Sequence, residues 1–103
     1  MVQQQKKEKN RVDWSPRAKK QRQNILVFYS ERNGSDTYSI KLDAEIRRIM
    51  EQFRSDPELG QLTKRKRIRR GVIAGRFAVF YRIKKDAIEV VAIVDARRNV
   101  PLD

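Results

Sequence analysis

The stretch that decides the fold runs from Lys64 to Arg98 and reads KRKRIRRGVIAGRFAVFYRIKKDAIEVVAIVDARR. It opens with a cluster of basic residues, and two apolar segments follow, Phe77–Ile83 and Ile88–Val94, separated by a short charged turn. Segments rich in β-branched and aromatic residues and bounded by turn residues are typical of strands. The stretch therefore predicts the antiparallel strands of a small sheet that carries a basic platform.

Positive charge is concentrated in this part of the chain. Between Glu58 and Asp86 there are ten basic residues and no acidic one, whereas the other fifteen basic residues nearly balance the 13 acidic residues. The formal net charge is +12. A clustered basic surface favours a nucleic acid, a ribonucleoprotein or an acidic protein as partner. A solvated basic surface without a specific target is the alternative.

Length and composition exclude several classes of protein. The 103 residues suffice for one domain, predicted over residues 10–103, with a flexible basic tail over residues 1–9. The sequence has no cysteine and no histidine, so disulfides, thiolate metal sites and histidine-based catalysis are excluded. Neither a metal nor a cofactor is expected. No apolar run reaches the roughly 20 residues of a membrane-spanning helix, and the N-terminus has no signal-peptide pattern, so a cytoplasmic location is expected.

A strand and a helix are predicted at the start of the domain. The strand occupies residues 10–14, where Val and Trp alternate with polar residues. Ser15 and Pro16 suit the N-cap and the first position of a helix, where the missing N–H of proline costs nothing. This helix should extend to about Glu31, and Gly34 is placed to end it.

A second helix should follow after a few residues. Ser35 or Asp36 is suited to begin it, and the pair Asp56 and Pro57 should stop it. Two helices joined by so short a segment form an antiparallel hairpin. The apolar stripe of the second helix has helical spacing and consists of Leu42, Ile46, Ile49, Met50 and Phe53.

Strands are predicted from about Arg65 to Ile73, and over the two apolar segments that follow, with a turn at Gly75. The fold class is therefore α+β with the order β-α-α-β-β-β, a helical hairpin packed on a small, mainly antiparallel sheet. Strand alternation assigns Phe77, Val79, Tyr81 and Ile83 to one face of the second of these strands, and Ala78, Phe80 and Arg82 to the other. It assigns Ile88, Val90, Ala92 and Val94 to one face of the third, and Glu89, Val91, Ile93 and Asp95 to the other.

The basic run is the leading candidate for a binding site. On a strand, Lys64 and Lys66 would share one face, and Arg65, Arg67 and Arg69 the other, with donors spaced by roughly 6.5–7 Å, close to the spacing of phosphates along a backbone. An edge strand whose charges prevent aggregation is the alternative. The residues predicted to bind a target or a nucleic acid are Lys64, Lys66, Arg67, Arg69, Arg70, Arg76, Arg97 and Arg98.

Two further features have competing interpretations. Arg97 and Arg98 follow the last strand, where a loop on a rigid sheet holds functional residues; ordinary surface arginines, one of them paired with Asp95, are the alternative. The aromatic residues are spaced as core residues, and a base-stacking platform would need them on an exposed strand face. Only Phe80 is expected to face outward, so core packing is favoured.

Four pieces of the sequence occur in an order that resembles the RelE/ParE superfamily of bacterial toxins from type II toxin–antitoxin modules. The resemblance covers about residues 10–101, and its pieces are Trp14-Ser15-Pro16-Arg17-Ala18, Asp56-Pro57-Glu58-Leu59-Gly60, Gly75-Arg76-Phe77-Ala78-Val79-Phe80-Tyr81-Arg82-Ile83 and Val94-Asp95-Ala96-Arg97-Arg98-Asn99-Val100-Pro101. It implies a compact α+β toxin whose sheet face is masked by a cognate antitoxin. The exposed basic face itself predicts that this antitoxin is a small acidic protein. Some members of the superfamily cleave messenger RNA on the ribosome, and others inhibit DNA gyrase without nuclease chemistry.

The resemblance to the nuclease branch is incomplete at particular positions. Arg69 matches a basic site on the first of the three strands that follow the helices. Arg97 matches the arginine after the last strand. Ala78 stands where the branch has a middle-strand arginine, and no tyrosine or histidine follows Arg97. If the protein is an enzyme, it is an endoribonuclease that works through Lys66, Arg69 and Arg97, with a crowded lysine as the proton acceptor.

The missing groups favour a particular function within the superfamily. The expected protein is a ParE-like toxin of a plasmid-stabilisation module, which binds an essential target such as DNA gyrase and is neutralised by a cognate acidic antitoxin. A RelE-like ribosome-dependent endoribonuclease is the first alternative. A non-toxic nucleic-acid-binding module is the second.

Overall fold

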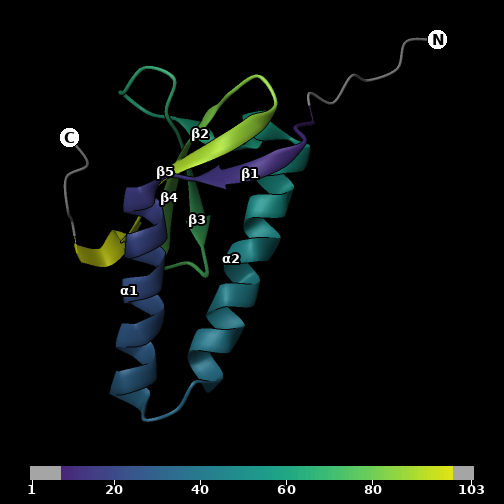
Figure 1. Ribbon diagram of the computed structural model, residues 1–103. Helices are drawn as coiled ribbons and strands as arrows, with labels where there is room; N and C mark the ends of the chain where they lie inside the picture. Colours follow the sequence, from purple (N-terminus) through teal and green to yellow (C-terminus); the bar gives the residue numbers. More distant parts are fainter. Residues whose placement is uncertain (1–7, 99–103) are drawn as a thin grey trace.

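A computed structural model describes residues 8–98 of the chain (Figure 1). The elements in chain order are β1 (Arg11–Trp14), α1 (Pro16–Asn33), α2 (Thr37–Ser55), the 3₁₀-helix η1 (Pro57–Leu59), β2 (Gln61–Leu62), β3 (Arg69–Ile73), β4 (Phe77–Ile83), β5 (Ala87–Asp95) and the 3₁₀-helix η2 (Ala96–Arg98). Most of the predicted tail lies outside the described residues. Its last residue, Lys9, is tied to the domain, because its N–H donates to the Arg54 carbonyl at 2.9 Å.

The strands form one mixed sheet in the order β1-β5-β4-β3-β2. β1 runs parallel to β5, and the other neighbouring pairs are antiparallel. The α1–α2 hairpin packs against the sheet and extends beyond it (Figure 1). The predicted α+β class, the helical hairpin and the mainly antiparallel sheet are therefore confirmed.

Local signals define the ends of the first helix. The Ser15 hydroxyl accepts a hydrogen bond from the N–H of Ala18 at 3.0 Å, which makes Ser15 the N-cap of α1. Gly34 follows α1 in the left-handed conformation with φ of 68°, which glycine adopts without a steric cost. A hydrogen bond links the two helices, since the buried Ser39 hydroxyl of α2 donates to the Leu26 carbonyl of α1 at 2.6 Å.

The core lies between the helical hairpin and one face of the sheet. From α2 it contains Leu42, Ile46, Met50 and Phe53, and the partly buried Ile49 packs against it, so the predicted stripe is confirmed. Its sheet residues are Ile73, Phe77, Val79, Tyr81, Ile88, Val90 and Ile93. The core-facing alternation predicted for β4 is confirmed at Phe77, Val79 and Tyr81, which are all nearly or completely buried.

The alternation predicted for β5 is wrong in its second half. Phe80 is opposite Ala92 and Tyr81 is opposite Val90, so Val91 is an extra residue in the ladder, a β-bulge. An extra residue exchanges the two faces of a strand beyond it. Ile93 therefore enters the core in place of Ala92. Because both faces of this segment are apolar, the sequence pattern carries no sign of the exchange.

The strand predicted over residues 65–73 is wrong in its first part. β3 begins at Arg69, and residues 63–68 form a loop that Thr63 closes, since its N–H donates to the Ile68 carbonyl at 3.1 Å. Inside the loop, Ile68 N–H donates to the Arg65 carbonyl at 3.2 Å, and Arg67 has a positive φ of 66°. Lys64 to Arg67 of the basic run therefore lie in a turn between β2 and β3, whereas Arg69 begins β3. The run presents no continuous row of donors at strand spacing.

Candidate functional site

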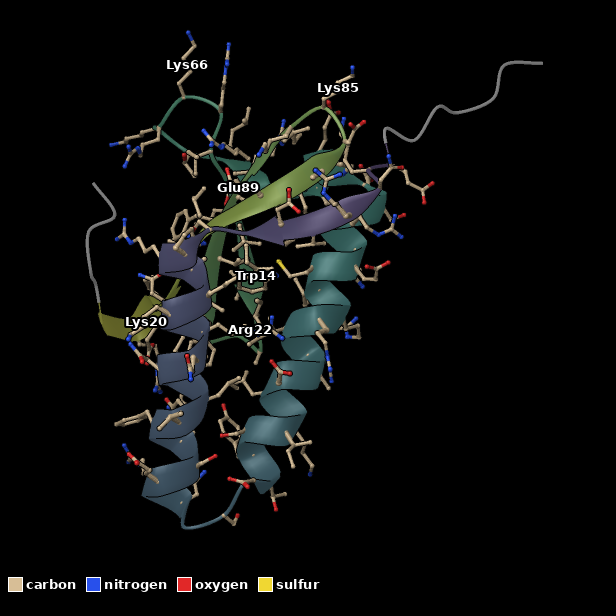
Figure 2. The ribbon with its side chains drawn as sticks, viewed as in Figure 1. Trp14, Lys20, Arg22, Lys66, Lys85 and Glu89 are labelled. Atoms are coloured by element: carbon tan, nitrogen blue, oxygen red, sulfur yellow. The ribbon has the colours of Figure 1, made fainter. Side chains whose placement is uncertain are left out.

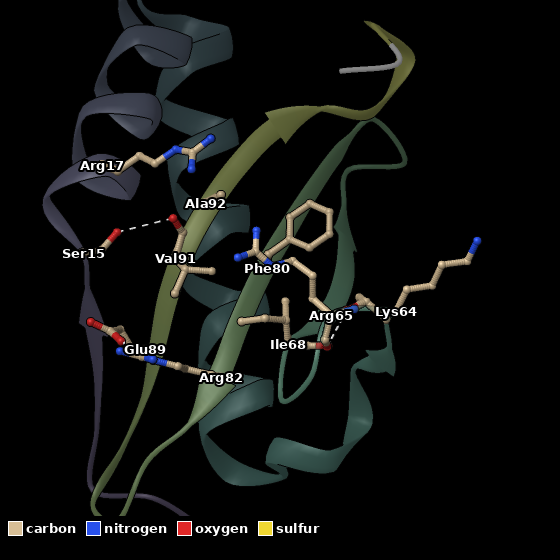
Figure 3. A pocket seen from close by; sticks show the side chains of 11 residues that line it. Ser15, Arg17, Lys64, Arg65, Ile68, Phe80, Arg82, Glu89, Val91 and Ala92 are labelled. Atoms are coloured by element: carbon tan, nitrogen blue, oxygen red, sulfur yellow. Dashed lines mark hydrogen bonds and ion pairs between the residues drawn. The ribbon is translucent and has the colours of Figure 1, made fainter. Parts of the chain in front are cut away.

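A groove with a volume of about 540 Å³ lies on the sheet face opposite the core. The start of α1 borders it on one side and the loop of residues 63–68 on the other (Figure 3). The groove is lined by Ser15, Arg17, Thr63, Lys64, Arg65, Ile68, Phe80, Arg82, Glu89, Val91 and Ala92. Four of these side chains are basic and one is acidic, so the groove joins the helix start and the basic loop into one positive site.

The floor of the groove is apolar. Phe80 and Ala92 form a cross-strand pair on the outer face, and the bulged residue Val91 and the loop residue Ile68 extend this surface. Phe80 is partly exposed, in contrast to the buried Val79 and Tyr81 beside it in β4. The prediction that Phe80 faces outward is therefore confirmed, and its ring belongs to the groove.

The acidic side chain in the groove is neutralised by a neighbour. Glu89 accepts a hydrogen bond from Arg82 across β4 and β5, with 2.6 Å between Oε1 and Nε. The Glu89 side chain is 18% exposed and the Arg82 side chain 52% exposed. A pair that is this short lowers the cost of holding a carboxylate near an anionic ligand. The groove therefore keeps the positive charge of Arg17, Lys64 and Arg65.

The predicted residues of the basic loop lie at different places. Lys64 lines the groove together with Arg65. Lys66 and Arg67 occupy the exposed turn of the loop and do not line the groove. Figure 2 shows Lys66 extending from the loop away from the rest of the molecule. The structure therefore brings one of the two predicted lysines to the groove.

Arg69 lies on the core side of the sheet. It is opposite Tyr81 in the β3–β4 ladder, whereas Arg70 is opposite Phe80 on the outer face. The Arg69 guanidinium donates to the carbonyls of Gly60 at 2.7 Å and Glu58 at 3.1 Å. Arg69 thus holds the segment that connects α2 to β2.

The Tyr81 hydroxyl fixes the same segment from inside. It donates to the Pro57 carbonyl at 2.6 Å and accepts from the Gly60 N–H at 2.9 Å. Burial raises the pKa of this hydroxyl above its ordinary value. Tyr81 is therefore a structural residue, and its hydroxyl is turned away from the groove.

Tyr81→Phe should destabilise the protein by about 1–3 kcal/mol, because a buried N–H and a carbonyl lose their partner. The loss should depend on pH. The pKa of Tyr81 is higher in the folded protein than in the unfolded chain, where it is about 10. The contribution of the neutral hydroxyl to stability is therefore complete below pH about 10, and it is lost as pH rises through the pKa of the folded state. Urea denaturation of both proteins between neutral and alkaline pH measures this. A difference that does not shrink at high pH would show that Tyr81 titrates freely.

Arg76 and Arg97 lie outside the groove. The Arg76 guanidinium stacks over the Tyr29 ring, with 5.0 Å to the centroid. Arg97 follows β5 and pairs with Asp95, its Nε 3.6 Å from Oδ1, as the alternative interpretation held. The side chain of Arg98 lies outside the described part of the chain.

The residues predicted for a nuclease are not gathered at one point. Arg69 is level with Tyr81 and Arg97 follows Asp95, which is level with Phe77. Tyr81 and Phe77 are four residues apart on β4, so the positions of Arg69 and Asp95 along the sheet differ by about 13 Å. Ala78, at the expected arginine position, is 2% exposed. Within residues 8–98, no group of three potential metal ligands occurs, and no helix is long and apolar enough to span a membrane.

The binding residues predicted from the sequence omit four charged residues of the groove, Arg17, Arg65, Arg82 and Glu89. Arg65 belongs to the basic run and was therefore within reach of the same argument. Arg82 has a weak signal in the sequence, since alternation places it on the same face as Phe80. Arg17 has none, because its place depends on how α1 approaches the outer face of the sheet. The positive charge of the groove thus depends on tertiary packing as well as on the basic run.

Comparisons with known proteins find one family model and several solved structures that are similar to this chain. The family model described as ParE toxin of type II toxin–antitoxin system, parDE, matches residues 12–100. A chain of the chromosomal ParDE TA system from P. aeruginosa has a TM-score of 0.71 at 16% identity and covers 82% of this chain and 92% of that chain. TrmO from Pseudomonas aeruginosa has a TM-score of 0.46 at 17% identity, over 84% of this chain and 36% of that chain.

No curated protein matches the sequence. At 16% identity the ParDE structure shows a shared fold alone. The family model, however, spans residues 12–100, nearly the whole described chain, including both helices and the sheet. This protein therefore belongs to the ParE toxin family of type II toxin–antitoxin systems.

Proposed function

We propose that the protein is a toxin that stops growth by binding an essential target such as DNA gyrase, and that a cognate acidic antitoxin neutralises it. The observation that carries this proposal is a family match over residues 12–100 in a chain whose basic groove is built for binding. The groove offers cations and an apolar floor, but it does not pair the proton acceptor and the proton donor that RNA cleavage also needs.

The chemistry of the groove supports binding over cleavage. Attack by a 2′-hydroxyl needs a proton acceptor, cations that stabilise the phosphorane and a proton donor for the leaving oxygen. The groove supplies the cations. Its one carboxylate, Glu89, is held by Arg82, the sequence has no histidine, and the hydroxyl of Tyr81 is bonded on the other side of the sheet. Lys64 is the one candidate proton acceptor that remains in the described groove, and no second group is placed beside it as the proton donor.

Charge and exposed apolar surface support an acidic antitoxin. The chain carries a net charge of +12, and Leu62, Ile40 and Phe28 are exposed apolar residues on β2 and the helices. An acidic amphipathic segment complements such a surface, as a strand added at a sheet edge or as a helix laid in a groove. Co-expression with the acidic product of an adjacent reading frame should restore growth and give a stable complex. Growth arrest that such a product leaves unchanged would contradict this part of the proposal.

Induction of the protein without an antitoxin separates the possible targets. We expect DNA synthesis to fall first, with filamentous cells and intact messenger RNA, and this is measured by incorporation of labelled precursors and by RNA sequencing. Immediate loss of translation with cuts at defined codon positions would contradict the gyrase proposal and favour a ribonuclease. Normal growth would contradict both.

A further inference from the structure

We infer that the groove also binds single-stranded nucleic acid, with one base stacked on Phe80 and neighbouring phosphates bound by the cations at its rim. This activity goes beyond the proposed inhibition of gyrase, because it needs no protein target. It assigns a role to three residues, Arg17, Arg65 and Phe80, that the binding residues predicted from the sequence do not include.

The aromatic floor is the first observation. Most residues of β4 are buried, yet Phe80 is partly exposed and lines the groove. Its partner across the ladder is Ala92, whose side chain is too small to cover the ring. Figure 3 shows the Phe80 ring standing in the groove above β4. An aromatic ring on an open strand face is a platform on which a base of any identity stacks.

The cations come from both borders of the groove. Arg65 extends from the basic loop over the floor toward Phe80, and Arg17 projects from the first turn of α1 on the other side (Figure 3). The Arg17 side chain is exposed and forms no hydrogen bond or ion pair with the described residues. Guanidinium groups bind phosphate through two parallel hydrogen bonds. Arg17 is therefore available to a phosphate next to the stacked base.

The size of the groove and the state of its one acid favour a single strand. A volume of about 540 Å³ lies in the range of small-ligand sites, which is about 300–1,000 Å³. In a duplex the base faces are covered by their neighbours, so only an unpaired base can reach the floor. Glu89 does not oppose the phosphates with a free charge, because Arg82 holds it.

Fluorescence anisotropy with a short labelled oligothymidylate tests this inference on the full-length purified protein. We expect binding that is tighter than to a duplex of the same length and that weakens steeply with salt. Phe80→Leu, which keeps an apolar floor, should weaken binding about 5- to 150-fold, the value of one base–aromatic stack. Arg17→Gln should lower the slope of log K against log salt by about 0.7, the value for one phosphate contact of a single strand.

Matched variants outside the groove provide the control. Lys66→Gln and Lys85→Gln remove the same charge from exposed turns, and each should weaken binding far less than Phe80→Leu. Equal losses for all four variants, or equal affinity for the duplex, would overturn the inference and leave an unspecific basic surface. Displacement of the oligonucleotide by polyglutamate at similar concentration would also overturn it and identify an acidic-protein site.

Arg17→Gln changes an exposed side chain, so its result stands if Phe80→Leu fails to fold. Failure of this test leaves gyrase inhibition intact, because that is measured separately.

Discussion

Phe77→Ala should lower the free energy of unfolding by about 3–5 kcal/mol, the range for deleting a fully buried aromatic side chain. Phe77 is 1% exposed and lies where β4 meets α1, with its ring 6.2 Å from that of Tyr29 in an edge-on contact. Its removal leaves a cavity between the helix and the sheet. Domains of this size have unfolding free energies of about 5–15 kcal/mol, so the variant should lose a large share of its stability.

Urea denaturation followed by circular dichroism measures this loss, and Phe28→Ala is the matched control. Phe28 lies next to Tyr29 on α1 but is 41% exposed, so its truncation should cost much less. Equal losses for the two variants would contradict the assignment of Phe77 to the core between α1 and β4.

Gly71→Ala should destabilise the protein by about 1–3 kcal/mol, the range for overpacking a filled core. Gly71 is buried in β3 opposite Val79, and a methyl group added there would overlap the Phe53 ring. Phe53 cannot move freely, because it stacks on Tyr81 with 4.7 Å between ring centroids. The glycine is therefore needed for the close approach of α2 to the sheet.

A double variant identifies the cause of this effect. In Phe53→Leu the smaller side chain should accommodate the added methyl group, so the double variant should be less destabilised than the sum of the two single variants. Val72→Ala is the control, since Val72 is the next residue on β3 and is 47% exposed. Strict additivity, or a neutral Gly71→Ala, would show that Phe53 does not restrict this position.

The parts of the fold that were predictable depend on local signals. Ser15 and Pro16 mark the start of α1, and Gly34 follows its end, because capping and φ preferences act over a few residues. The stripe of α2 is equally local, since helical periodicity alone selects its buried residues. The family resemblance also holds, and the matched residues 12–100 agree closely with the span from which it was inferred.

The errors arise where neighbours in space decide the outcome. Nothing in the sequence of β5 marks Val91 as a bulge, because residues on both faces are apolar there. The alternation of residues in the basic run is typical of a strand. In the structure, the Thr63 N–H donates to the Ile68 carbonyl and closes the run into a loop. This hydrogen bond depends on the pairing of β2 with β3, which the sequence pattern does not show.

The candidate site was predictable only in part for the same reason. Lys64 was identified by charge, and it does line the groove. Arg17 and Glu89 are distant in sequence from the basic run and join it through the packing of α1 and β5. Arg69 has the right residue type for phosphate binding, but its register opposite Tyr81 directs it to the carbonyls of Glu58 and Gly60.

The proposal that the protein is a gyrase-directed toxin is tested most directly with purified components. DNA gyrase and relaxed plasmid are incubated with increasing amounts of the protein, and supercoiling is followed by gel electrophoresis, with messenger RNA on purified ribosomes as the parallel substrate. We predict inhibition of supercoiling at stoichiometric concentrations and intact messenger RNA. Full gyrase activity together with cleavage of ribosome-bound messenger RNA would contradict the proposal.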